Sequence, residues 1–114
     1  MNKALINDIL TFQTELGLEE EELKDLYGNL MEELREIRKE LRQTFARGDS
    51  QQFFKAIHNL KGVAGSYRLF PVFDQARKID AGKIQGLSGL SLEDFASLHK
   101  ALDEAFGTIE EMFL

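Results

Sequence analysis

Residues 19–48, EEEELKDLYGNLMEELREIRKELRQTFARG, decide the fold of this chain. Apolar side chains recur in this stretch every three or four residues, which is the spacing of one helix face. They are Leu23, Leu26, Leu30, Leu34, Ile37, Leu41 and Phe45, with Tyr27 and Met31 widening the stripe. The opening glutamates suit the positive end of a helix dipole, and Gly48 is the usual residue type just past a helix end. The pattern predicts a long amphipathic helix that buries one face against other helices.

Similar patterns flank this helix on both sides. Upstream, a short helix is predicted from the spacing of Leu5, Ile9, Phe12 and Leu16. Downstream, Asp49 has the character of an N-cap for a third helix that ends around residues 65–68. Pro71 suits the first turn of a fourth helix, and Ser91 suits the cap of the last helix after a glycine-containing loop over residues 82–90. The expected fold is all-α: an antiparallel four-helix-type bundle with an additional short N-terminal helix.

Composition narrows the classes of protein to which the chain can belong. Its 114 residues fit one domain, so a single unit over residues 1–114 is expected. The absence of cysteine excludes a disulfide framework and a thiolate metal site. The net charge of -6 disfavours nucleic acid and anionic membrane surfaces as partners, so the expected partner is a protein. No apolar run approaches the ~20 residues of a membrane span, and the N-terminus does not resemble a signal peptide, so a cytoplasmic location is expected.

The glutamates of the long helix alternate with basic residues. Glutamates occupy positions 32, 33, 36 and 40, and basic side chains occupy positions 35, 38, 39 and 42. Such a pattern predicts a solvated helix face with ion pairs between residues four apart.

His58 is the candidate for chemistry because of its position on the third helix. The apolar stripe of that helix consists of Phe53, Ile57, Leu60 and Ala64. At about 100° per residue, His58 points roughly 130° away from the middle of this stripe, toward solvent. Lys61 and Gly62 follow three and four residues later and share its surface, and Phe54 places an aromatic ring beside the same patch. The other histidine, His99, has no polar cluster around it in sequence and is interpreted as a surface or boundary residue.

The three neighbouring residues fit the chemistry of a phosphoryl carrier. An imidazole has an ordinary pKa of ~6.5, so it is a competent nucleophile near neutral pH. Lys61 could offset the charge of a phosphoryl group, and Gly62 removes bulk so that a partner can approach. No acid or base partner of His58 is evident in the sequence, which favours a carrier over a hydrolase. Taken alone, the same residues also fit an ordinary helix surface.

Residues 58–65, HNLKGVAG, resemble the His-x-Leu-Lys-Gly-x-Ala-Gly signature of the histidine-phosphotransfer domains of two-component phosphorelays. The order of helices along the chain is similar to that family as well. The resemblance implies that His58 is the phosphoryl acceptor, that Lys61 steadies the phosphoryl oxygens, and that Gly62 leaves room for a receiver domain.

The resemblance also bears on residues outside this triplet. Asp80 falls where family members often have Glu or Gln near the site, and Gly65 corresponds to a helix-packing or helix-end glycine. Arg68 departs from the family, which commonly has glycine ten residues after the histidine. It is interpreted as either an additional cation near the site or a solvated loop arginine. The expected partner-binding residues are Phe54, Gly62, Gly65, Arg68 and Asp80.

The function implied by the resemblance is that of a phosphorelay intermediate rather than an enzyme. Its partner would be a response-regulator receiver domain or a hybrid sensor histidine kinase, and a monomer is expected. No cofactor or metal of its own is expected, since the receiver would supply the aspartate and Mg²⁺. Two alternatives stay open: a non-phosphorylated helical adaptor that binds by the same face, and a phosphotransfer segment excised from a larger kinase, with the same chemistry.

Overall fold

The computed structural model describes residues 2–113, and over this range every regular element is helical. The α-helices are α1 (Lys3–Leu16), α2 (Glu20–Arg47), α3 (Ser50–Ser66), α4 (Phe70–Asp80) and α5 (Leu92–Phe113). Two short 3₁₀ turns, Lys83–Gln85 and Leu87–Gly89, lie between α4 and α5. No helix in the described range combines the length and apolar character needed to cross a membrane.

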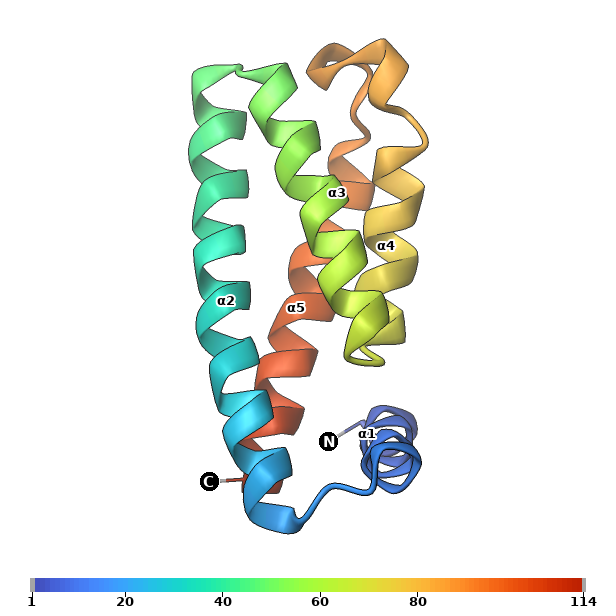
Figure 1. The fold of residues 1–114 in the computed structure, drawn as a ribbon. Coiled ribbons are helices and arrows are strands. Elements are labelled where there is room, and N and C mark those ends of the chain that lie inside the picture. Colours follow the sequence, from blue (N-terminus) through green and yellow to red (C-terminus); the bar gives the residue numbers. More distant parts are fainter. Residues whose placement is uncertain (1, 114) are drawn as a thin grey trace.

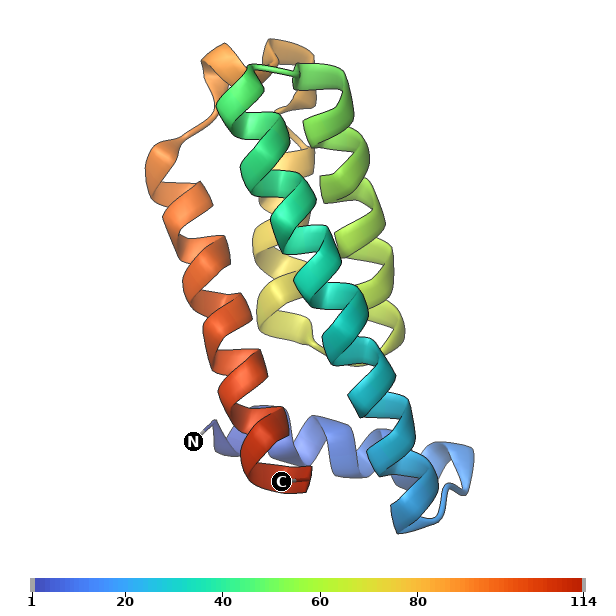
Figure 2. The same cartoon turned by 90° about the vertical axis from the view of Figure 1, so that its left-hand side faces the viewer.

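Helices α2 to α5 run side by side in alternating directions and form an elongated bundle, as Figure 1 shows. The molecule measures 44 × 22 × 21 Å along its principal axes. Helix α1 does not join the bundle as a fifth parallel rod; it lies across one end, and Figure 2 shows it along its length. The predicted all-α architecture, an antiparallel four-helix bundle with an additional N-terminal helix, is therefore confirmed.

The ends of the helices follow local signals in the sequence. Gly17 and Gly48 both end their helices in the left-handed conformation, with φ of 65° and 68°. The Asp49 carboxylate accepts a hydrogen bond from the amide three residues on at 3.1 Å, and the Ser91 hydroxyl does the same at 3.2 Å. The fourth helix begins at Phe70, one residue before the proline that was expected to open it.

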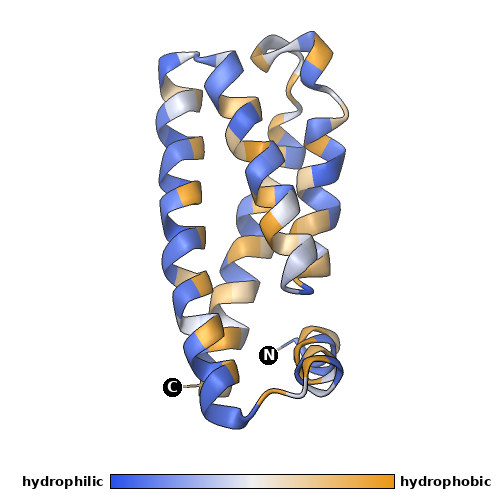
Figure 3. Cartoon of the chain, viewed as in Figure 1, coloured by the Kyte–Doolittle hydropathy of each residue, from blue (hydrophilic) through white to orange (hydrophobic). Residues whose placement is uncertain are grey.

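The core lies where the apolar faces of the helices meet along the bundle axis. Figure 3 shows apolar residues on the inward faces and hydrophilic residues on the outward faces. Two predictions about this core are wrong: Leu16 is 55% exposed and Phe45 is 37% exposed, and Thr44 is buried in place of Phe45. The Thr44 hydroxyl donates to the Glu40 carbonyl at 2.7 Å, which satisfies it within the helix. Phe45 lies in the last turn of α2 at the end of the bundle, where solvent reaches its ring from one side.

An aromatic cluster fastens α1 to the end of the bundle. The rings of Phe12, Tyr67 and Phe113 lie 5.8–6.4 Å from that of Tyr27. The Tyr27 hydroxyl donates to the Tyr67 carbonyl at 2.8 Å, which ties α2 to the turn that follows α3. Burial of Tyr27 raises the pKa of its phenol well above the ordinary value, so the hydroxyl stays a donor. The turn between α3 and α4 is thereby held in place from two other helices.

Candidate functional site

His58 lies near the middle of α3, on the side of the helix that faces away from the core. Its side chain is 71% exposed, whereas its neighbours Ile57 and Leu60 are fully buried. The prediction that His58 points to solvent is confirmed. An imidazole in this position is accessible to a second protein on its solvent side, and the helix that carries it fixes its backbone.

The antiparallel course of α4 brings its last residue, Asp80, beside His58. The Asp80 Oδ2 lies 2.9 Å from the Lys61 Nζ and 3.9 Å from the His58 Nδ1. The shorter distance is a charge-assisted hydrogen bond, and the longer one places the carboxylate beside the imidazole without a hydrogen bond. No acidic partner of His58 is evident in the neighbouring sequence, because the carboxylate comes from the next helix, 22 residues along the chain, at the residue that the family resemblance placed near the site.

The carboxylate of Asp80 is buried, with 6% of the residue exposed. Burial raises the pKa of this group, but the Lys61 hydrogen bond and charge, with the charges of Lys83 and His58, outweigh it and hold the pKa below its usual range. Asp80 is thus ionised at neutral pH. Its second oxygen, Oδ1, is buried and has no hydrogen-bond partner among the described residues. The result is a fixed negative charge directly behind the imidazole.

The two glycines after His58 lie in different surroundings. A Cβ placed on Gly62 would meet nothing within 4 Å, so this residue leaves a bare strip of helix next to the histidine. A Cβ on Gly65 would lie 3.1 Å from the ring of Phe73 on α4, which is tighter than ordinary contact. Gly65 therefore permits the close packing of α3 on α4, and Gly62 keeps the surface open.

Phe54 does not provide the exposed ring that the helix geometry predicted. It is 9% exposed and packs edge-on against Phe53, with ring centroids 5.1 Å apart. The physical reason is the breadth of the buried face of α3. Phe54 precedes Lys61 by seven residues and so shares its flank, and the Lys61–Asp80 contact shows that this flank faces α4. A helix packed against two neighbours buries more than one stripe.

Arg68 lies in the turn between α3 and α4, with its side chain 37% exposed, and it interacts with α1. Its guanidinium pairs with Glu15 of α1 at 3.1 Å and lies 5.3 Å from the centre of the Phe12 ring. Its φ of 63° is the left-handed conformation, which costs an ordinary residue roughly 1 kcal/mol and glycine nothing. This requirement accounts for the glycine that is common at this position in the family that the sequence resembles. In this chain the arginine at this position contacts Glu15 and Phe12 of α1.

Two grooves meet at His58. The first, of about 700 Å³, runs between α2 and α3 and is lined by Glu33, Glu36, Ile37, Glu40, Gln52, Lys55, Ala56, His58 and Asn59. The second, of about 690 Å³, runs toward α1 and is lined by Phe12, Leu16, Leu26, Glu33, His58, Asn59, Gly62, Val63, Ser66 and Tyr67. Sequence reasoning did not assign Asn59 or the α2 glutamates to the site. The spacing of three and four among Glu33, Glu36 and Glu40 was the available signal.

The expected ion pairs along α2 are not formed. Among the described residues no salt bridge joins two side chains of that helix. Arg38 pairs with Asp103 of α5, and both Arg35 and Arg38 lie over the Phe106 ring, at 5.6 and 4.7 Å from its centre. The basic side chains thus turn toward α5, and the glutamates on the α3 side are left without cations from their own helix.

Comparison with known proteins agrees with this arrangement. The family model of the Hpt domain matches residues 25–108, well over half of the chain. The match takes in α3 and α4 together with most of α2 and α5, and it leaves α1 outside. Searches of curated proteins and of solved structures returned no match. Hpt domains have a histidine-phosphotransfer role in two-component signalling, in which they act as phosphocarriers. On the family match and the helical bundle together, the chain belongs to the Hpt domain family.

Proposed function

We propose that this chain is a phosphorelay intermediate that accepts a phosphoryl group on His58 and passes it to or from an aspartate of a response-regulator receiver domain. The observation that carries the proposal is an exposed imidazole backed by a buried, ionised carboxylate. In the described residues His58 is the histidine with this combination, since His99 is partly buried and lies on α5.

The transfer step follows from the direction in which the imidazole faces. Nδ1 lies 3.9 Å from the Asp80 Oδ2, and in the proposed step this nitrogen carries the proton while Nε2 presents its lone pair to the partner. Nε2 attacks the phosphorus of the receiver's aspartyl phosphate. The P–N bond forms as the P–O bond breaks, and the aspartate leaves as a carboxylate. The ring keeps its Nδ1 proton, and the positive charge that it gains lies near Asp80. The reverse step returns the group.

Lys61 and Gly62 complete the acceptor site in this proposal. The Lys61 side chain is 28% exposed, and its ammonium, which pairs with Asp80 one helical turn from His58, neutralises the phosphoryl oxygens in this proposal. The open space above Gly62 lets the receiver bring its own aspartate and Mg²⁺ into line with Nε2. The domain positions the imidazole and provides charge, and the receiver provides the aspartate and Mg²⁺.

The test is transfer from a receiver domain phosphorylated with labelled acetyl phosphate, drawn from a panel of receivers, to the wild-type chain and to His58→Gln. The wild type should carry an acid-labile, base-stable label, and His58→Gln should carry none. His99→Gln is the matched control and should be labelled like the wild type. If the folded wild type binds receivers but is labelled by none of them, the chain is an adaptor and the proposal fails.

A further inference from the structure

The two grooves that meet at His58 differ in chemical character, and this difference bears on the orientation of the partner. They share Glu33, His58 and Asn59, so a protein that covers the imidazole must lie over the mouths of both. A typical specific interface covers about 800 Å² on each partner, which is enough to reach both grooves from His58. The inference below rests on the proposed function, because it concerns the receiver that would dock there.

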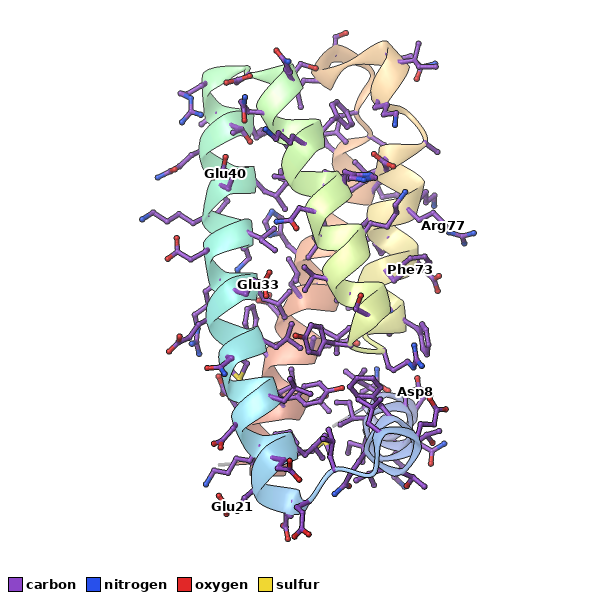
Figure 4. All side chains as sticks on the ribbon, viewed as in Figure 1. Asp8, Glu21, Glu33, Glu40, Phe73 and Arg77 are labelled. Atoms are coloured by element: carbon purple, nitrogen blue, oxygen red, sulfur yellow. The ribbon has the colours of Figure 1, made fainter. Side chains whose placement is uncertain are left out.

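The groove between α2 and α3 has an acidic wall. Glu33, Glu36 and Glu40 lie on one face of α2, are all exposed, and form no salt bridge in the described part of the chain. Figure 4 shows Glu33 and Glu40 projecting from α2 beside α3. The floor includes Ile37 and Ala56, and Lys55 is the one cation among the lining residues. The net charge of this groove is therefore negative next to the phosphoryl acceptor.

The groove toward α1 is mostly apolar. Its lining includes Phe12 and Leu16 from α1, Leu26 from α2, Val63 from α3, and Tyr67 from the turn that follows α3. Leu16 is 55% exposed although it is a large aliphatic residue on a helix with a well-buried inner face. This groove depends on α1, which lies outside the segment that matches the Hpt domain family. The family match therefore assigns no role to the α1 side of the surface.

We propose that these two grooves fix the orientation of the receiver: basic side chains lie over the acidic wall of α2, and an apolar surface covers the groove at α1. Charge complementarity supports the first contact, since three unpaired carboxylates repel an acidic surface and attract a basic one. Burial of Leu16 supports the second, since an exposed aliphatic side chain gains free energy when a partner removes it from water. A receiver docked the other way round would place apolar surface on carboxylates. The arrangement thus selects both the partner and its direction of approach.

The test compares two variants with two matched controls, using the receiver that labels the wild type fastest in the panel. Glu36→Lys reverses one charge in the acidic wall, and Glu32→Lys makes the same change on the same helix outside the groove. Leu16→Gln removes the apolar contact, and Leu10→Gln does so at another exposed leucine of α1 that does not line the groove. Circular dichroism and thermal melting confirm that all four remain folded.

Glu36→Lys should lower kcat/KM about tenfold through KM, with a loss that shrinks as salt is raised. Leu16→Gln should lower kcat/KM a few-fold with little dependence on salt, and both controls should stay within about twofold of the wild type. If the wild type is labelled but Glu36→Lys and Leu16→Gln transfer as fast as their controls, the proposed orientation is wrong and the carrier function stands. Faster transfer to Glu36→Lys, or a loss confined to the rate at saturating receiver, would also overturn it. Failure of the wild type to be labelled by any receiver would instead sink the proposed function.

Discussion

The two histidines of this chain lie in amphipathic helices of the same bundle, and their surroundings are opposite. His58 is 71% exposed and has a buried, ionised carboxylate behind it. His99 is partly buried with its ring 4.6 Å from that of Phe95, and its buried Nδ1 has no hydrogen-bond partner among the described residues. Burial lowers the pKa of His99, and the nearby Arg42 and Arg38 lower it further, against a smaller opposing effect of Asp103.

The difference shows what a phosphoryl acceptor needs beyond an imidazole. At His99 a positive charge on the ring is opposed by burial and by two arginines. At His58 a positive charge faces Asp80, and the second nitrogen is free to meet a partner. Transfer to His99 would place two further negative charges in a packed boundary, whereas transfer to His58 places them in water beside a lysine. Two features of the His58 side and one feature of His99 can be tested one at a time.

Filling the bare strip beside His58 should have the largest effect. Gly62→Leu places a side chain where a Cβ meets nothing within 4 Å, so the helix should stay folded and gain up to about 1 kcal/mol of helix propensity. The same side chain should hold the receiver away from Nε2 and lower kcat/KM for transfer by about a hundredfold or more. Gly28→Leu, at an exposed and equally open position of α2, is the control. Unchanged transfer to a folded Gly62→Leu would show that the receiver does not approach over this strip.

Removing the charge behind the imidazole should have a smaller effect. Asp80→Asn removes the buried carboxylate from beside the imidazole and keeps the size of the side chain. The rate at saturating receiver should fall about tenfold, because the charge that develops on the ring loses its counter-ion. Folding stability, measured by urea denaturation, should change by less than about 2 kcal/mol, since Lys61 is near enough to the surface to be hydrated. A large loss of stability with an unchanged rate would make Asp80 a structural residue only.

The smallest effect concerns His99 and appears in stability rather than in transfer. Its pKa in the folded chain lies below the ordinary 6.5, so the unfolded chain binds a proton that the folded chain does not. The contribution of His99 to stability is therefore complete above pH 6.5 and is lost as the pH falls toward the folded pKa. Between about pH 7.5 and about pH 5 the wild type should lose more free energy of unfolding than His99→Gln. Parallel pH profiles for the two proteins would contradict this assignment.

Local signals in the sequence were sufficient for the helices and for the exposure of His58. Periodicity and capping residues act within a few residues along the chain, so Gly17, Gly48, Asp49 and Ser91 each mark a helix end that the structure contains. The direction of the His58 side chain likewise depends only on its offset from the apolar stripe of α3. These features needed no knowledge of how the helices pack.

Features that depend on packing could not be predicted in this way. Asp80 reaches His58 only because α4 runs antiparallel to α3 in one register, and no spacing rule joins residues 22 apart. Phe54 is buried because α3 meets two helices, and a single-stripe description of a helix assumes one. Arg68 turns toward α1 because of a left-handed backbone conformation that nothing in its neighbouring residues signals. The site residues of α3 were therefore predicted from the sequence itself, whereas Asp80 of α4 was expected near the site only from the family resemblance, without its contact to His58.

In the proposed function, the exposure of His58 also affects the lifetime of the phosphoryl group and the choice among receivers. A phosphoryl group on this side chain would stand in open solvent, beside a residue with no side chain of its own. The domain gives such a group no shielding from water. Its lifetime is then set by the phosphoramidate bond and by the supply of receivers. Specificity between pathways then depends on kinetic competition, in which the receiver that associates and docks fastest takes the phosphoryl group.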